Sequence, residues 1–144
     1  MLIVTVEVSG GRAGCLLGFA TQGNIDPPRF LLCLLRRNRT LRVAARVETL
    51  AAHILGPKHG RRASLFGEQI GGEVDKVARC RWRPGPGRPL LEGCEHWFAG
   101  RVPDRMGTGD HVAVLVQPVA AAAGWIGGQL GFRDVQSLQP DHPP

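Results

Sequence analysis

Two short groups of residues in this sequence are suited to binding a ligand that carries a flat ring and a phosphate. The first runs from Gly18 to Gln22 and contains Phe19, Ala20 and Thr21. Because Gly18 and Ala20 carry little side-chain bulk, a flat ring could approach the backbone closely there. We therefore predict a loop whose backbone N–H groups contact the ring and stabilise negative charge on it.

The second group is Asn38-Arg39-Thr40, which begins a predicted helix over residues 40–47. Asn and Thr cap helices well, and the free N–H groups of a helix start, with guanidinium groups beside them, favour an anion such as phosphate. Ordinary capping explains Asn38 and Thr40 equally well, and the two roles are compatible. A flat ring joined to a phosphate describes FMN, so the two groups together indicate a flavin site.

The sequence carries none of the common motifs of hydrolases, metal sites or phosphate loops. It contains no G-x-S-x-G, H-E-x-x-H or P-loop, and no G-x-G-x-x-G that would open a Rossmann unit. The histidines have no i, i+3 or i, i+4 spacing, and the four cysteines form no C-x-x-C pair. We predict no metal site, and we expect the cysteines to be buried, reduced thiols of a cytoplasmic protein.

The hydrophobic pattern predicts a mainly β, antiparallel barrel with one or two short helices that positions these groups. Strand-like segments recur between tight turns, and the rigid Asp26-Pro27-Pro28 corner separates two of them. We predict about seven strands, over residues 2–8, 13–17, 30–35, 50–55, 77–83, 94–102 and 111–119, and residues 130–138 could supply a last strand. Helices are predicted over residues 40–47 and 63–69. His53 lies in one strand, where we expect a core or ligand-facing hydrogen bond.

Length and charge limit the domain organisation and the partners. The 144 residues suit a single domain, which we place at residues 1–138 with a loose tail over 139–144. No signal segment opens the chain, and no apolar run is long enough to span a membrane. The net charge of +6 fits an anionic small ligand and also nucleic acid. Nucleic acid is the weakest alternative, because no aromatic side chains are interleaved on a basic strand face.

Three arginines alternate with apolar residues over residues 77–83. This segment could be a strand with a solvated basic face, or it could bind the phosphate of a dinucleotide. The sequence alone leaves both alternatives open.

Taken together, the motifs resemble the flavin reductase-like family. The resemblance covers residues 3 to 119 and depends on the collinear order of short motifs: the loop ending in Asp26-Pro27-Pro28, the apolar strand 30–35, Asn38-x-Thr40, Ala51-Ala52-His53-Ile54-Leu55, Leu65-Phe66-Gly67, Asp75-Lys76, Pro89-Leu90-Leu91-Glu92-Gly93 and Gly109-Asp110-His111. It implies the FMN-binding, Greek-key split β-barrel of NAD(P)H:flavin oxidoreductases. It also implies a homodimer with flavin sites near the interface.

The resemblance assigns expected roles to individual residues. Asn38 and Thr40 match the family's phosphate-binding pair, and His111 resembles the family residue near the flavin or nicotinamide. His111 could equally be a strand-start residue that satisfies the preceding turn. The family usually has Thr and Ser where this chain has other residues, namely Leu16, Gly18, Phe19 and Gln22, whereas Thr21 keeps a hydroxyl.

Two functions remain as alternatives. The first is an enzyme that reduces FMN, or FAD, with NAD(P)H by direct hydride transfer to flavin N5, which needs stacked rings and no catalytic triad. Such a flavin reductase could supply a flavin-dependent monooxygenase. The second is a flavin-binding electron-transfer or non-catalytic module without NAD(P)H activity of its own.

Overall fold

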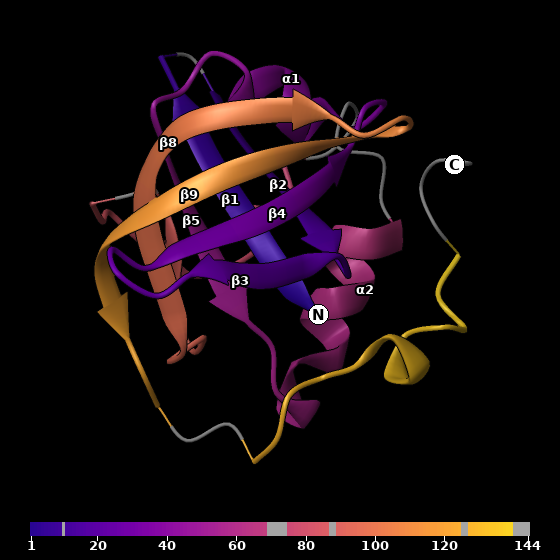
Figure 1. Ribbon diagram of the computed structural model, residues 1–144. Coiled ribbons are helices and arrows are strands. Elements are labelled where there is room, and N and C mark those ends of the chain that lie inside the picture. The colour runs from indigo at the N-terminus through magenta and orange to yellow at the C-terminus, as the bar shows by residue number, and fades with distance from the viewer. Residues whose placement is uncertain (10, 69–74, 87–88, 125–126, 140–144) are drawn as a thin grey trace.

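A computed structural model describes residues 1–9, 11–68, 75–86, 89–124 and 127–139 (Figure 1). Seven antiparallel strands form one curved sheet in the order β2-β1-β5-β8-β9-β4-β3. Their bounds are Leu2–Val8 (β1), Gly11–Leu17 (β2), Ala20–Asn24 (β3), Arg29–Leu35 (β4), Thr49–Ile54 (β5), Trp97–Gly107 (β8) and His111–Ala122 (β9). The predicted antiparallel, mainly β architecture is confirmed.

Strand β1 shows how the sheet separates two apolar layers. Leu2, Val4 and Val6 face the barrel interior, where they pack with residues of β4, β5, β8 and β9. Ile3 faces the other side and belongs to a second cluster that includes Phe66. Successive side chains of a strand point to opposite faces, so a strand that carries apolar residues on both faces must be covered on both sides.

Helix α1 (Arg39–Ala44) packs against β1, β2 and β4 and adds apolar residues to the interior core. Its start is capped by Asn38, whose side-chain oxygen accepts a hydrogen bond from the Thr40 N–H at 2.8 Å. At its other end, the Arg105 guanidinium donates to the carbonyls of Ala44 and Val47. Both ends of this short helix are therefore satisfied by side chains, although it ends three residues earlier than predicted.

Helix α2 (Gly60–Glu68) follows the 3₁₀ turn η1 (Pro57–His59) and covers β2 from outside the barrel. Gly14 permits this close packing: a Cβ at this position would lie 2.6 Å from Cε1 of Phe66. The buried Lys76 donates to the Phe66 carbonyl at 2.9 Å, near the end of the helix. The helix thus has a positive charge at its C-terminal end, where the macrodipole favours one.

The prediction of a strand over residues 77–83 was wrong for most of its length. The Asp75 carboxylate accepts a hydrogen bond from the Ala78 N–H at 2.9 Å, and the Cys80 N–H donates to the Val77 carbonyl at 3.0 Å. These bonds hold a turn, so only β6 (Trp82–Arg83) is extended, and it pairs with β7 (Leu90–Leu91). The alternating sequence pattern was overridden by local turn bonding.

The possible last strand over residues 130–138 was also wrong. This segment contains the 3₁₀ turn η2 (Phe132–Asp134), because the Asp134 carboxylate accepts a hydrogen bond from the Gly131 N–H at 2.8 Å. Further turns follow up to Leu138. Of the predicted tail, residues 140–144 lie outside the described part of the chain, as does residue 69 of the second predicted helix.

Candidate functional site

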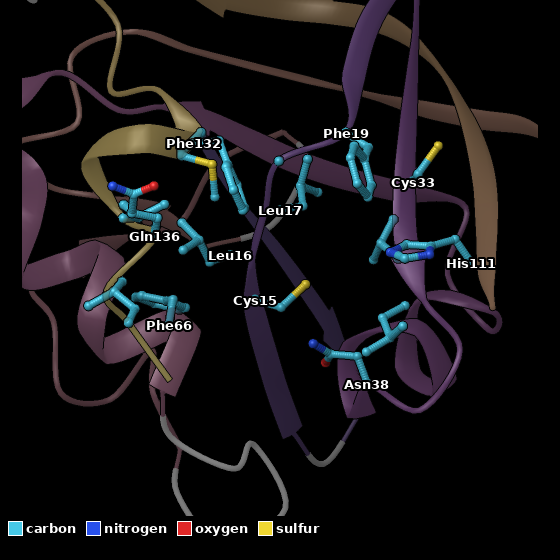
Figure 2. Close-up of a pocket in the computed structure, with 17 residues that line it drawn as sticks. Cys15, Leu16, Leu17, Phe19, Cys33, Asn38, Phe66, His111, Phe132 and Gln136 are labelled. Atoms are coloured by element: carbon cyan, nitrogen blue, oxygen red, sulfur yellow. The ribbon is translucent and has the colours of Figure 1, made fainter. Parts of the chain in front are cut away.

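A cavity of about 420 Å³ lies where β2 ends, and we call it the β2 cavity (Figure 2). Its walls come from the end of β2 and its exit, β4, the start of β9, helix α2 and the C-terminal segment. The lining residues are Met1, Cys15, Leu16, Leu17, Gly18, Phe19, Cys33, Leu34, Leu35, Asn38, Phe66, Gly67, His111, Phe132, Val135, Gln136 and Leu138. The volume and the mostly apolar walls are those of a small-molecule site.

His111 and Phe19 form an aromatic pair at one edge of the cavity. Their ring centroids lie 5.4 Å apart with an interplanar angle of 73°, and Figure 2 shows both rings beside Cys33. His111 Nδ1 donates to the Asp110 carboxylate at 2.7 Å, and this hydrogen bond lowers the pKa of Asp110. Since Nδ1 carries the proton in this bond, Nε2 is the ring nitrogen left to meet a ligand.

The turn before β9 is tied to the end of β4, and this tie positions His111. The backbone N–H of Arg36 donates to the Asp110 carbonyl at 2.8 Å, and the Arg36 Nε donates to the Gly109 carbonyl at 2.6 Å. Asn38 lies two residues further along, at the start of α1, and its side chain is almost completely buried. Residues far apart in the sequence are therefore held at one end of the barrel.

The other half of the cavity is formed by helix α2 and the C-terminal segment. Figure 2 shows Phe66, Phe132 and Gln136 grouped on the opposite side of β2 from His111. Leu16 projects from β2 toward the same group and lies 3.1 Å from the position of a Cβ built on Gly67. Phe132 is 71% exposed, so this apolar ring forms part of a rim open to solvent.

Four of the predicted site residues line the β2 cavity: Gly18, Phe19, Asn38 and His111. Ala20, Thr21 and Gln22 do not line it, because they belong to the exposed edge strand β3, which pairs with β4, rather than to a loop. Gln22 instead donates to the Asn24 carbonyl at 3.0 Å. Of residues 18–22, therefore, Gly18 and Phe19 line this cavity, and ligand contacts of Ala20, Thr21 and Gln22 remain a prediction.

Arg39 and Thr40 also lie outside the cavity wall, in the first turn of α1. Thr40 is only 1% exposed. Its backbone N–H is already bonded to the cap, so its visible role is at the start of the helix. Whether it also holds a phosphate remains a prediction.

Sequence reasoning did not assign the cavity residues of α2 and the C-terminal segment. The motif Leu65-Phe66-Gly67 is part of the family resemblance but carries no predicted role, and residues 130–138 are predicted only as a possible strand. Cys15 and Cys33 both line the cavity, and none of the four cysteines forms a disulfide in the described structure. Cys15 and Cys94 are buried as expected, whereas Cys33 and Cys80 are only partly buried. The sequence signal that could have indicated this part of the cavity wall was the Leu-Phe-Gly motif at the end of a short helix.

In the part of the chain that the structure describes, no group of three or more His, Cys, Asp or Glu side chains could hold a metal ion. No described helix is both long enough and apolar enough to cross a membrane. His53 is completely buried, with Nδ1 bonded to the Ile3 carbonyl at 3.1 Å and Nε2 accepting from the Leu91 N–H at 3.1 Å. It is a core residue, one of the two roles expected.

Residues 1–130 match a family model described as a flavin reductase like domain. One relative is the FMN reductase (NADH) RutF of Bradyrhizobium diazoefficiens, which is 29% identical over 119 residues that cover 82% of this chain and 66% of the relative. Another is the RutF of Methylorubrum extorquens, which is 31% identical over 84% of this chain and 59% of its own length. The chain thus spans about three-fifths to two-thirds of these two curated relatives.

Solved structures have the same fold. The flavin reductase domain protein of Arthrobacter sp. FB24 superposes with a TM-score of 0.79 at 22% identity, over 89% of this chain and 79% of the other. The NADH:FAD oxidoreductase SgcE6 of Streptomyces globisporus gives a TM-score of 0.78 at 23% identity, over 90% and 77% of the two chains. These likenesses confirm the predicted split β-barrel.

Proposed function

Because this chain belongs to the flavin reductase like family, we propose that it reduces a flavin with a nicotinamide coenzyme. The observation that carries the proposal is that Gly18, Phe19, Asn38 and His111 converge on one cavity. These four residues come from three separate places in the sequence, and the sequence alone predicts each of them as a site residue.

The residues of the β2 cavity fit the ring system of a flavin. Leu16, Leu17 and Phe66 provide apolar walls, and Gly18 adds no side chain where the chain leaves β2. Asn38 and His111 are the few polar groups among many apolar ones, which is the usual composition of a cofactor site. We propose that the ring lies in this cavity, with its phosphate toward Asn38, Arg39 and Thr40.

A bound flavin would supply the N5 atom that accepts a hydride from the nicotinamide C4. The chain's own contribution is to position the rings and to exclude water. His111 is held by Asp110 and can present Nε2 to a polar edge of the ligand, while Phe19 offers an aromatic surface beside it. No further catalytic group is needed for direct hydride transfer.

The names of the relatives guide the choice of substrates. Relatives named FMN reductase (NADH) favour FMN and NADH as the first pair to test, and the NADH:FAD oxidoreductase keeps FAD as an alternative. Another relative, 27% identical, is named as the reductase subunit of a stachydrine N-demethylase in Rhizobium meliloti. We propose that this chain delivers reduced flavin to a partner oxygenase.

The test of the proposed function is NADH oxidation by the purified protein, with NADPH compared under the same conditions. FMN, FAD and riboflavin are added separately, and the loss of coenzyme absorbance is followed. Flavin-dependent oxidation supports the proposal. Its absence with all three flavins and both coenzymes would contradict it.

A specific observation favours the second candidate, a flavin-binding module without coenzyme activity. Leu16, Gly18 and Phe19 line the cavity at positions where the family usually has hydroxyl side chains, so fewer side-chain hydrogen bonds are available to hold the flavin. The two candidates differ in one measurement. A module would quench flavin fluorescence on binding but would leave NADH and NADPH unoxidised.

We also propose a homodimer. The inner face of β4 is buried at Leu32 and Leu34, whereas Leu31, Cys33 and Leu35 on the other face are only partly buried. A partly exposed apolar strand face of this kind suits contact with a second subunit. Light scattering at micromolar concentration should give twice the monomer mass, and a monomeric mass would contradict the proposal.

A further inference from the structure

A strongly basic groove lies beside the N-terminal half of helix α2. Two neighbouring hollows of about 480 and 310 Å³ share Arg61, Arg62 and Gly93 in their walls. We call the combined surface the basic groove. It is lined by Lys58, His59, Arg61, Arg62, Leu65, Arg79, Cys80, Arg81, Glu92 and Gly93.

The charges of the groove are poorly balanced within the described part of the chain. Five lysine and arginine side chains line it, of which Arg79 already has an interaction partner, and Glu92 is the one carboxylate among the described lining residues. Glu92 pairs with Arg81 at 3.2 Å, and Glu95 nearby lies 3.7 Å from Lys58. Arg61 is exposed and makes no ion pair with the described residues.

Arg62 is fixed in position by neutral partners. Its Nη1 donates to the Cys94 sulfur at 2.9 Å, and its Nη2 donates to the Glu92 carbonyl. Burial raises the pKa of the Cys94 thiol, which therefore stays protonated and carries no charge to offset the guanidinium. His59 helps to hold the same loop, because its Nε2 lies 2.8 Å from the Gly93 carbonyl. The Arg62 guanidinium is therefore held rigidly in the groove, and these partners do not neutralise its charge.

The location of these cations on α2 adds to the imbalance. The first turn of the helix has no acidic residue and carries Arg61 and Arg62, and Lys58 lies just before it. Cations at this end of a helix are repelled by the macrodipole, whereas the buried Lys76 is at the favourable end. A bound anion would relieve the repulsion among these side chains.

We propose that the basic groove binds a diphosphate, either free or as part of a nucleotide coenzyme. Guanidinium groups match phosphate oxygens with paired hydrogen bonds, and several converging arginines suit two linked phosphates better than one carboxylate. The groove is separate from the β2 cavity, although α2 forms part of both: Leu65 lines the groove, and Phe66 and Gly67 line the cavity.

Pyrophosphate is the probe for a direct test on the full chain without flavin. Isothermal titration at low ionic strength should detect binding that weakens as salt is added. The double variant Arg61→Gln/Arg81→Gln should weaken pyrophosphate binding at least about tenfold, since two charged hydrogen-bond donors are lost. The control Arg46→Gln/Arg101→Gln removes the same charge from exposed residues outside the groove and should change the affinity less than about twofold.

Enzyme kinetics distinguish a diphosphate that is part of the coenzyme from a free diphosphate. If the groove holds the coenzyme, the KM for NADH or NADPH should rise in the groove variant while kcat stays within about twofold, because uniform binding is lost. If KM is unchanged while pyrophosphate binding is weakened, the ligand is a free diphosphate. Either result supports the site, whereas no pyrophosphate binding, or equal binding by groove and control variants, would overturn it. The pyrophosphate titration does not depend on flavin reduction, whereas the KM comparison rests on the proposed function.

Discussion

The ring of Phe19 meets the ring of His111 edge-on, with centroids 5.4 Å apart, at the edge of the β2 cavity. Phe19 is 64% exposed, so this contact is one of its few constraints in the described structure. An exposed aromatic ring held against a histidine at a cavity edge is well placed to cover a flat ligand.

The first prediction concerns this ring. Phe19→Ala should raise the Kd for FMN about fivefold, because an aromatic contact of about 1 kcal/mol is lost. The Kd is measured by quenching of flavin fluorescence. Ile25→Ala is the control, since Ile25 is equally apolar, 85% exposed and outside the cavity. The same Kd in both variants would place the flavin away from Phe19.

The second prediction concerns the FMN phosphate. Arg39→Gln should weaken FMN binding about tenfold at low salt and leave riboflavin nearly unchanged, because only FMN offers a charged phosphate. Fluorescence titration of both ligands measures the effect. Arg42→Gln, an exposed change on the same helix, is the control. Equal losses for FMN and riboflavin would mean that the phosphate binds elsewhere.

Thr40→Ala tests whether the Thr40 hydroxyl binds the phosphate. The cap bond to Asn38 is made by the Thr40 backbone N–H and stays in place, so loss of the buried hydroxyl should lower the free energy of unfolding by at most about 1 kcal/mol. Urea denaturation measures this loss. If FMN affinity falls more than riboflavin affinity as well, Thr40 also serves the phosphate. If the ratio of FMN affinity to riboflavin affinity is unchanged, Thr40 serves only the helix.

The fourth prediction concerns pH and the buried His53. Burial lowers its pKa from 6.5 to about 4, so the folded protein keeps the ring neutral where the unfolded chain takes up a proton. The free energy of unfolding should therefore be highest above pH 6.5 and should fall by at most about 3 kcal/mol as the pH drops toward 4. Urea denaturation across this range measures the slope.

Two variants test whether the pH dependence of stability comes from His53. His53→Asn keeps one donor and one acceptor but cannot titrate, so its stability should vary less over the same pH range. His96→Gln changes a half-buried histidine near the Gly124 carbonyl and should keep the wild-type slope. A wild-type slope in a folded His53→Asn protein would contradict the assignment.

The fifth prediction tests the packing of α2 on β2. Gly14→Ala should lower the free energy of unfolding by about 1–3 kcal/mol, since the new Cβ would meet the Phe66 ring at 2.6 Å. Gly23→Ala is the matched control, because a Cβ there meets nothing within 4 Å. Adding Phe66→Leu to Gly14→Ala should recover part of the loss. Equal stabilities of the two glycine variants would show that the helix shifts freely.

The sequence was informative where local pattern and tertiary packing agree. The apolar runs of β1, β4 and β9 predict strands, and Asn38 predicts the cap that the structure contains. The pattern failed at β3, a polar and fully exposed edge strand whose extended form depends on pairing with β4. Pairing between strands leaves no trace in the composition of such a segment.

The site was predictable only where its residues belong to local sequence motifs. Gly18, Phe19, Asn38 and His111 belong to short motifs, so they could be named in advance. Phe66 and the C-terminal wall reach the cavity only because α2 and the final segment pack against β2. No local spacing indicates that contact, since it depends on residues such as Gly14 that allow close approach.

The strand order also determines when the barrel can close during synthesis. Strand β4, a continuous apolar run, pairs with β3 immediately before it and with β9 through residues 111–116. A ribosome makes the chain from the N-terminus, so one edge of β4 stays without its partner while residues 36–110 emerge. Closure must await this distant pairing, which is a slow step because it joins segments far apart in the chain. Until then, this apolar edge of the nascent protein needs protection from other chains.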